Sequence, residues 1–341
     1  MLSLVFMILS CNKNENPFIP PEEPSIVDSN FFNWKYIEIN GVNIGGTMFV
    51  ADTNKVFIEA DICLLLYDNG VFHNIDYKDP DFFSNTVFGI DANNVFIGGG
   101  SLSTHSSKLK KWNGTDIIDI PMPIDSSVRI LDIVPISENE LWISTDGNIV
   151  HHYINNNFNT YRLNDNYMST QLSLENGNTL YTFALKMFNE NYYSYNVYEF
   201  KNENWIKIYS DSVTPNTELS FVYIGYCNDK LLRRGKSGIY TFSGTNWVRQ
   251  IPMYGEAIPE SAGGNSFNNL LISGNTIFDN TCDWGRKIYY YDGKKLYRQK
   301  NHVFQLDQGV VGSIYYKFGR FYLSYFGDLF HYYFSIATFK N

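Results

Sequence analysis

The chain has 341 residues and a formal net charge of −9 at pH 7, with 35 acidic and 26 basic side chains. Nucleic-acid binding needs a basic surface, and the sequence has no basic cluster beyond Lys108–Lys111, so we expect no nucleic-acid partner. Aromatic residues make up 17% of the chain. Twisted sheets packed face to face use large flat side chains, so this content needs no ligand to explain it.

The N-terminal segment carries the first informative motif. Leu2–Ser10 is apolar but too short to span a bilayer. Its last three residues and the next one form the sequence Ile-Leu-Ser-Cys, which ends at Cys11. This motif resembles the lipobox of bacterial lipoproteins. The resemblance implies cleavage before Cys11, acylation of that cysteine and a lipid anchor in a bacterial cell envelope. Asn12 after the cysteine favours the outer membrane or the cell surface.

We divide the chain into residues 1–11 as a signal peptide, residues 12–33 as a flexible tether and residues 34–341 as one folded domain. Asn12–Pro24 is proline-rich and lacks hydrophobic periodicity, as is typical of an extended linker. The rest of the chain consists of repeats with no linker between them, which favours a single domain.

A four-strand unit recurs roughly every 45 residues, and this period is typical of a β-propeller with one four-stranded blade per repeat. The clearest copy is Val128–Leu163. Turns rich in Asn and Gly separate the third and fourth strands, because both central residues of a tight hairpin take positive φ. The predicted second strands read KVFIE, NVFIGG, ELWIS, TLYTF, KLLRR, NLLIS and RFYLS. They predict seven blades, with six or eight as alternatives.

The last repeat, Gly319–Phe339, lacks a fourth strand of its own. Phe32–Ile39 near the start of the chain resembles the fourth strands at Asn202–Tyr209 and Gly244–Ile251. We therefore predict that this N-terminal segment pairs with the last repeat and closes the ring, which also covers an otherwise exposed sheet edge.

Two stretches of the repeats resemble known propeller families. Val128–Tyr161 is similar to the regulator-propeller repeat of bacterial sensor ectodomains. The IDANNVFIGG stretch, followed by LKKWNG, is similar to repeats of secreted bacterial propellers. The resemblance implies the fold and carries no activity with it.

Loop lengths predict which face of the propeller binds a ligand. Loops from strand two to strand three, and from blade to blade, emerge on one face, and here they are the long ones, including Leu185–Ser194 and Ser273–Arg286. Loops longer than a turn requires usually carry function. In the longest, a tryptophan beside carboxylates and an arginine could bind a sugar, and packing of that tryptophan onto its own blade is the alternative. These candidate residues are Asp279, Asp283, Trp284 and Arg286.

Two further groups of residues are candidates. Tyr192, Tyr193 and Tyr195 alternate across a strand start, so at least one should face the core. Arg233 and Arg234 replace apolar or small residues at the end of a second strand, and their side chains must point to opposite sheet faces. An arginine turned toward a neighbouring blade needs an acid or a ligand anion, since an unpaired buried charge is costly.

The cysteines other than Cys11 match no metal site. We expect Cys63 in the core, and Cys227 and Cys282 could form a disulfide between adjacent blades. No motif predicts a metal, a cofactor or a known catalytic triad.

We therefore predict a non-enzymatic, monomeric envelope lipoprotein whose propeller binds a protein or a polysaccharide through its long-loop face. A carbohydrate-active hydrolase or lyase is one alternative, and a sensory or assembly module is another.

Overall fold

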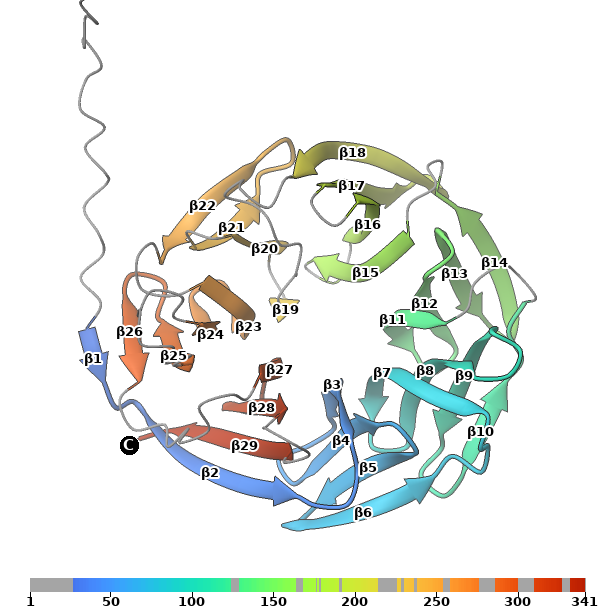
Figure 1. The fold of residues 1–341 in the computed structure, drawn as a ribbon, viewed down its shortest axis with the longest axis horizontal. Helices are drawn as coiled ribbons and strands as arrows, with labels where there is room; N and C mark the ends of the chain where they lie inside the picture. Colours follow the sequence, from blue (N-terminus) through green and yellow to red (C-terminus); the bar gives the residue numbers. More distant parts are fainter. Residues whose placement is uncertain are drawn as a thin grey trace, which may run out of the picture.

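The chain folds as a ring of seven β-sheets (Figure 1). The computed structural model describes residues 27–123, 129–163, 168–175, 177, 179–189, 192–213, 226–227, 230–235, 238–253, 258–275, 286–299, 310–326 and 332–340. All regular structure in these residues is β-strand. The protein is a seven-bladed β-propeller, as the repeats predict. Among the described residues, no helix is long and apolar enough to cross a membrane.

Blades one to four each contain four antiparallel strands in chain order. Blade one contains β3 (Ile44–Val50), β4 (Lys55–Ala60), β5 (Cys63–Asp68) and β6 (Val71–Asp76). Blade two contains β7 (Phe82–Asp91), β8 (Asn94–Ser101), β9 (Ser107–Trp112) and β10 (Ile117–Ile120). Blade three contains β11 (Ile130–Ser137), β12 (Glu140–Thr145), β13 (Ile149–Ile154) and β14 (Asn157–Arg162). Blade four contains β15 (Met168–Glu175), β16 (Thr179–Asn189), β17 (Tyr192–Lys201) and β18 (Asn204–Val213).

The next two blades are less regular. The described part of blade five has three strands, β20 (Leu232–Gly235), β21 (Gly238–Phe242) and β22 (Trp247–Pro252). Blade six contains β23 (Ile258–Ser266), β24 (Asn269–Asn275), β25 (Arg286–Tyr291) and β26 (Leu296–Gln299). The short strand β19 (Tyr226–Cys227), which precedes blade five, pairs in parallel with β23 of blade six.

The ring closes as the sequence predicts. Blade seven contains β27 (Val310–Lys317), β28 (Arg320–Phe326) and β29 (Tyr332–Phe339), and its outer strand is β2 (Phe32–Ile39). Phe32 pairs with Phe339 and Ile39 with Tyr332, so the two strands are antiparallel along their full length. The edge of the last three strands is therefore covered by the beginning of the folded chain (Figure 1).

The first described strand comes before β2, inside the segment that the sequence assigns to the tether. Strand β1 (Val27–Ser29) pairs in parallel with β26 of blade six. The Arg298 side chain lies 2.7 Å from the Asp28 carboxylate. The Gln299 amide donates to Ser29 and its oxygen accepts from the Phe31 amide. The N-terminal segment thus joins blade six to blade seven.

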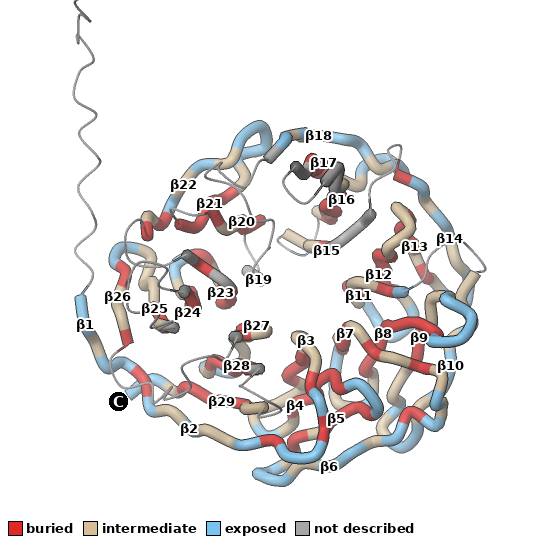
Figure 2. Tube along the Cα trace, in the orientation of Figure 1, coloured by how far each residue is buried: buried red, intermediate tan, exposed pale blue. Residues whose placement is uncertain are grey.

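The Asn- and Gly-rich turns have the predicted backbone. Asn155 and Asn156 have φ of 49° and 65°, and Asn69 and Gly70 have 51° and 98°. Positive φ at both central residues matches the twist of the flanking strands. Most buried residues lie in the inner and middle strands, while the outer strands are mostly exposed or partly exposed (Figure 2). Cys63 is part of this core at 4% exposure, as expected.

Side chains on the inner strands link neighbouring blades near the axis. The inner strands β3, β7, β11, β15, β23 and β27 each contain a bulge or register shift. The Thr47 hydroxyl accepts from the Val87 amide in the next blade at 2.9 Å. The Asp132 carboxylate likewise accepts from Leu172, also at 2.9 Å. Because β7 and β15 are edge strands of their sheets, these bonds satisfy amides on the free edge and link each inner strand to the next blade.

Candidate functional site

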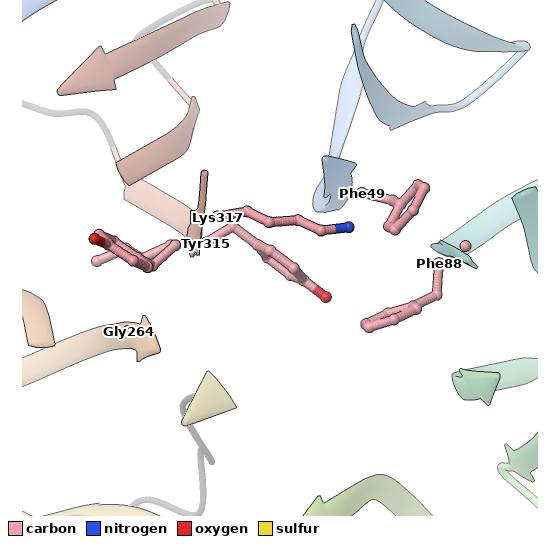
Figure 3. Close-up of a pocket in the computed structure, with 8 residues that line it drawn as sticks. Phe49, Phe88, Gly264, Tyr315 and Lys317 are labelled. Carbon is pink, nitrogen blue, oxygen red and sulfur yellow. The ribbon is translucent and has the colours of Figure 1, made fainter. Parts of the chain in front are cut away.

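A cavity of about 240 Å³ lies where four inner strands end, next to the axis of the ring (Figure 3). We call it the channel cavity, and its lining comes from β3, β7, β23 and β27. These are the inner strands of four consecutive blades, six, seven, one and two. The lining residues are Phe49, Phe88, Gly89, Gly264, Ile314, Tyr315, Tyr316 and Lys317.

The channel cavity lies on the face opposite to the one that loop length indicates. An inner strand starts at a blade-to-blade connection and ends at the short turn before strand two. Lys317 is the last residue of β27, and Phe49 and Phe88 lie in the second halves of β3 and β7. The cavity therefore opens toward the face with the tight turns.

Four aromatic residues line the channel cavity, and the rings of three of them, Phe49, Phe88 and Tyr315, follow one another along its wall. The Phe49 and Phe88 ring centroids are 5.9 Å apart, and the Phe88 and Tyr315 centroids are also 5.9 Å apart. Gly89 is required beside them, because a Cβ there would lie 2.6 Å from the Phe49 ring. Such rings provide apolar contact area with little loss of side-chain entropy on binding.

Lys317 is the charged residue of the channel cavity. Its Nζ atom donates to the Val50 carbonyl at 2.7 Å and lies 4.7 Å from the Phe49 ring centroid (Figure 3). Burial lowers the pKa of the Lys317 amine. Among the described residues, no carboxylate forms an ion pair with Lys317. A ligand could therefore supply the anion that this cation lacks.

Exposed apolar side chains lie at neighbouring strand ends on the same face. Ile90 near the end of β7, Ile136 near the end of β11 and Phe318 after β27 are 37%, 43% and 50% exposed. The described residues that line the channel cavity include no carboxylate. The arrangement can hold an apolar or aromatic group and an anion.

Two carboxyl groups elsewhere have pKa values raised to about 7, and burial is the main cause for both. Glu59 lies between blades one and two, where its Oε1 is 3.0 Å from the Ser84 hydroxyl. Asp132 lies between blades three and four and accepts from the Leu172 and Ile133 amides. The two groups lie at different blade junctions and neither lines the channel cavity, so they do not form a catalytic pair there.

The predicted arginine pair points to two different blades. The Arg233 side chain is fully buried, donates to the Tyr195 hydroxyl in blade four and lies 4.2 Å from that ring's centroid. The Tyr195 hydroxyl in turn donates to Asp211 at 3.1 Å. Arg234 instead approaches the Pro259 carbonyl of blade six at 3.4 Å. The arginine side chains therefore have protein partners in the blades on either side.

The remaining predicted site residues are only partly described. Tyr192 and Tyr193 begin β17, where they pair with Asn189 and Met187 of β16. The segment 185–194, expected as a long loop, is thus largely a β-hairpin, because the ladder continues past the predicted strand ends. Tyr195 is the fully buried member of the tyrosine group. Arg286 begins β25 and pairs with Asn275.

Several predicted residues lie outside the described part of the chain. The predicted lipid attachment and the disulfide between Cys227 and its partner in blade six stay predictions. So does the role of the long loop in blade six. The residues concerned are Cys11, Asp279, Cys282, Asp283 and Trp284.

Sequence reasoning missed the channel cavity. A signal was present in the first strands of three repeats. Phe49, Phe88 and Tyr315 each follow a buried apolar residue, and each pairs with the third residue of the second strand. Lys317 was a second signal, as a lysine directly after two tyrosines in an inner strand. Aligning the first strands of the repeats, in addition to the second strands, would have brought these positions together.

No family model and no curated protein matches the sequence. Solved structures match the fold at low identity. A structure described as YCF48 bound to D1 peptide has a TM-score of 0.66 and 11% identity, covering 93% of this chain and 100% of that one. A chain of the mitotic checkpoint complex has a TM-score of 0.62 and 12% identity, covering 99% and 100%.

A third similar structure is the extracellular domain of a putative hybrid two-component system from B. thetaiotaomicron. Its TM-score is 0.59 at 10% identity, with 89% of this chain and 42% of that one covered. At these identities the likeness establishes the propeller fold alone.

Proposed function

We propose that this protein is a non-enzymatic propeller that binds a segment of a partner protein while a lipid on Cys11 holds it at a membrane of a bacterial cell envelope. The channel cavity is the observation that carries the binding proposal. It combines three aromatic rings with a lysine that has no carboxylate partner among the described residues. A peptide with an apolar or aromatic side chain next to a carboxylate fits this lining.

The solved structures support a protein ligand by analogy. One similar propeller is described as bound to a peptide, and another belongs to a protein assembly. The third is described as the extracellular domain of a putative two-component system, which is consistent with a propeller that acts as a sensory module through contacts with proteins. Propellers use one scaffold for many functions, so this analogy supports the class of ligand and does not identify it.

Site-specific photocrosslinking tests the binding proposal and separates the two faces. A photoreactive phenylalanine analogue replaces Phe88 at the channel cavity, Trp284, which the sequence assigns to the long-loop face, or Val71 on the outer strand β6, in cells that express the full chain. We expect a discrete crosslinked protein from position 88, and none from position 71. Lys317→Met should reduce the yield at position 88. Crosslinking from position 284 alone would move the binding site to the long-loop face.

Cell fractionation tests the anchor separately. Cys11→Ser should release the protein from the membrane fraction and abolish incorporation of a labelled fatty acid. Two or three acyl chains hold a protein at a bilayer almost irreversibly, because each buried methylene contributes about 0.8 kcal/mol. A Cys11→Ser variant that stays in the membrane fraction would contradict the lipid anchor and leave the binding proposal intact.

A further inference from the structure

A second hollow lies at the junction where the ring closes. It has a volume of about 410 Å³ and lies between blade seven, with its outer strand β2, and the turns of blade one. We call it the seam groove. Its lining residues are Asn33, Trp34, Lys35, Thr53, Asn54, Tyr67, Asn69, Gly70, Arg320, Ile336 and Thr338.

Two cations line the seam groove, and neither has a carboxylate partner in the described part of the chain. The Lys35 ammonium donates to the Tyr67 hydroxyl at 2.9 Å, and an Arg320 nitrogen donates to the Thr53 carbonyl at 3.3 Å. Neither side chain forms an ion pair with a described carboxylate. Since the whole chain has a net charge of −9, a groove with two cations and no lining carboxylate stands out from its surroundings.

The two acids next to lining residues in the sequence, Asp52 and Asp68, are engaged by other groups. The Asp52 carboxylate accepts from the amides of Asn54 and Lys55 at 2.7 and 2.9 Å. The Asp68 carboxylate accepts from the Asn69 side chain at 2.8 Å and lies 3.9 Å from the Lys55 ammonium. These carboxylates therefore leave the donors of Lys35 and Arg320 available to an anion.

The rest of the lining suits hydroxyl groups. Asn33 and Asn54 are exposed, and no hydrogen bond to either side-chain amide is formed by the described residues. Each amide can both donate and accept, as vicinal sugar hydroxyls do. Buried Tyr67 and Ile336 add apolar surface to the lining.

We propose that the seam groove binds a short oligosaccharide that carries uronic-acid carboxylates. The planar guanidinium of Arg320 matches a carboxylate in shape and charge, and the asparagine amides match the ring hydroxyls. A long polyanion is disfavoured because the protein is acidic overall. We choose a saccharide over an acidic peptide because each exposed side-chain amide can bond to two neighbouring ring hydroxyls, and the test separates the two ligands.

Titration calorimetry on the folded chain tests this site. The probes are trigalacturonic acid, its methyl ester, which keeps the hydroxyls and lacks the charges, and a glutamate-rich peptide of the same charge. We expect the acid to bind at least tenfold more tightly than the ester, with affinity that falls as salt is raised. Arg320→Gln should weaken binding of the acid about tenfold and Asn54→Ala by a smaller factor.

Arg162→Gln is the matched control, because Arg162 is an exposed arginine on β14, far from the seam groove in the sequence and on another blade. It should leave the affinity unchanged. Asn54→Ala alters an exposed turn residue, so it reports on the groove even where Arg320→Gln perturbs folding. Equal affinity for acid and ester, no binding of the acid, or preferential binding of the peptide would each overturn the proposal.

Discussion

The ammonium of Lys317, at the end of the last blade's inner strand, lies 4.7 Å from the centroid of the Phe49 ring in the first blade. The same ammonium donates to the Val50 carbonyl. This contact crosses the junction at which the ring closes, and it holds a partly buried charge beside the channel cavity. Closure of the fold and construction of the proposed binding site therefore depend on the same pair of blades.

Replacing Lys317 by methionine should leave the fold intact while it removes the anion-binding group. Methionine preserves much of the apolar stem that packs against Phe49, and the charge itself is disfavoured by burial. We expect a free energy of unfolding within about 1 kcal/mol of that of the parent chain. Chemical denaturation measures this quantity, and a large loss of stability would show that Lys317 acts as a structural residue.

The stability of the protein should fall as the pH rises from about 4.5 to about 7, in part because of Glu59. Its folded-state pKa is raised to about 7 from 4.5, so the folded state binds the proton more tightly than the unfolded state does. The geometry permits this, because the one Ser84 hydroxyl proton lies within reach of both the Ala60 carbonyl at 2.7 Å and the Glu59 carboxyl oxygen at 3.0 Å, and it can go to the carbonyl when Glu59 is protonated. A protonated Glu59 can then donate to Ser84.

Glu59→Gln should remove this contribution to the pH dependence. The Glu59 contribution amounts to roughly 3 kcal/mol of unfolding free energy between pH 4.5 and pH 7. Asp132 changes the stability in the same direction, in the parent chain and in the Glu59→Gln variant alike. Urea denaturation at several pH values between 4 and 8 measures it, with exposed Glu138→Gln as the control. An unchanged slope in the Glu59→Gln protein would show that Glu59 is charged in the fold at all these pH values.

Gly45→Ala should destabilise the protein by about 2 kcal/mol, because a Cβ at this position would overlap the Glu59 carboxyl group. The neighbouring Glu59 side chain is the obstacle, so the double variant Gly45→Ala with Glu59→Ala should lose less stability than the sum of the two single changes. Thermal unfolding of the four proteins gives the coupling energy. Strict additivity would show that the clash is relieved elsewhere.

Arg233→Ala should cost about 3 kcal/mol, since it leaves the hydroxyl of Tyr195 and the carboxylate of Asp211 without their buried cation. Tyr195→Phe removes the link between the arginine and the carboxylate, so the double variant should be less destabilised than the sum. Denaturation in the presence of candidate ligands is the further check. Stabilisation of the parent protein by a small anion, absent in the Arg233→Ala protein, would indicate a binding site in place of a structural pair.

The sequence predicted the ring well because its evidence is local. Phe32–Ile39 has the same pattern as the fourth strands of inner repeats, and this likeness alone predicted its pairing with the last blade. The opposite orientation of Arg233 and Arg234 also followed from strand alternation. Both features follow from the alternation of side chains along a strand and from the repeat of the four-strand unit, and both patterns can be read within a short stretch of sequence.

The channel cavity depends on which inner strands meet at the axis, and no local pattern contains that information. Phe49 and Lys317 are at opposite ends of the chain and become neighbours only when the ring closes. The seam groove has the same origin, since Lys35 and Arg320 come from the two segments that pair at closure. Loop length drew attention to the other face, because long loops are visible in a sequence and a cavity between short ones is not.

Hydrogen exchange, measured by mass spectrometry on the complex recovered by crosslinking, tests the proposed binding site most directly. The partner should slow exchange in peptides that cover residues 82–91 and 310–317, where Phe88, Tyr315 and Lys317 lie. Lys317→Met should reduce this protection. Protection confined to residues 276–286, with the ends of β7 and β27 exchanging as in the free protein, would contradict binding at the channel cavity.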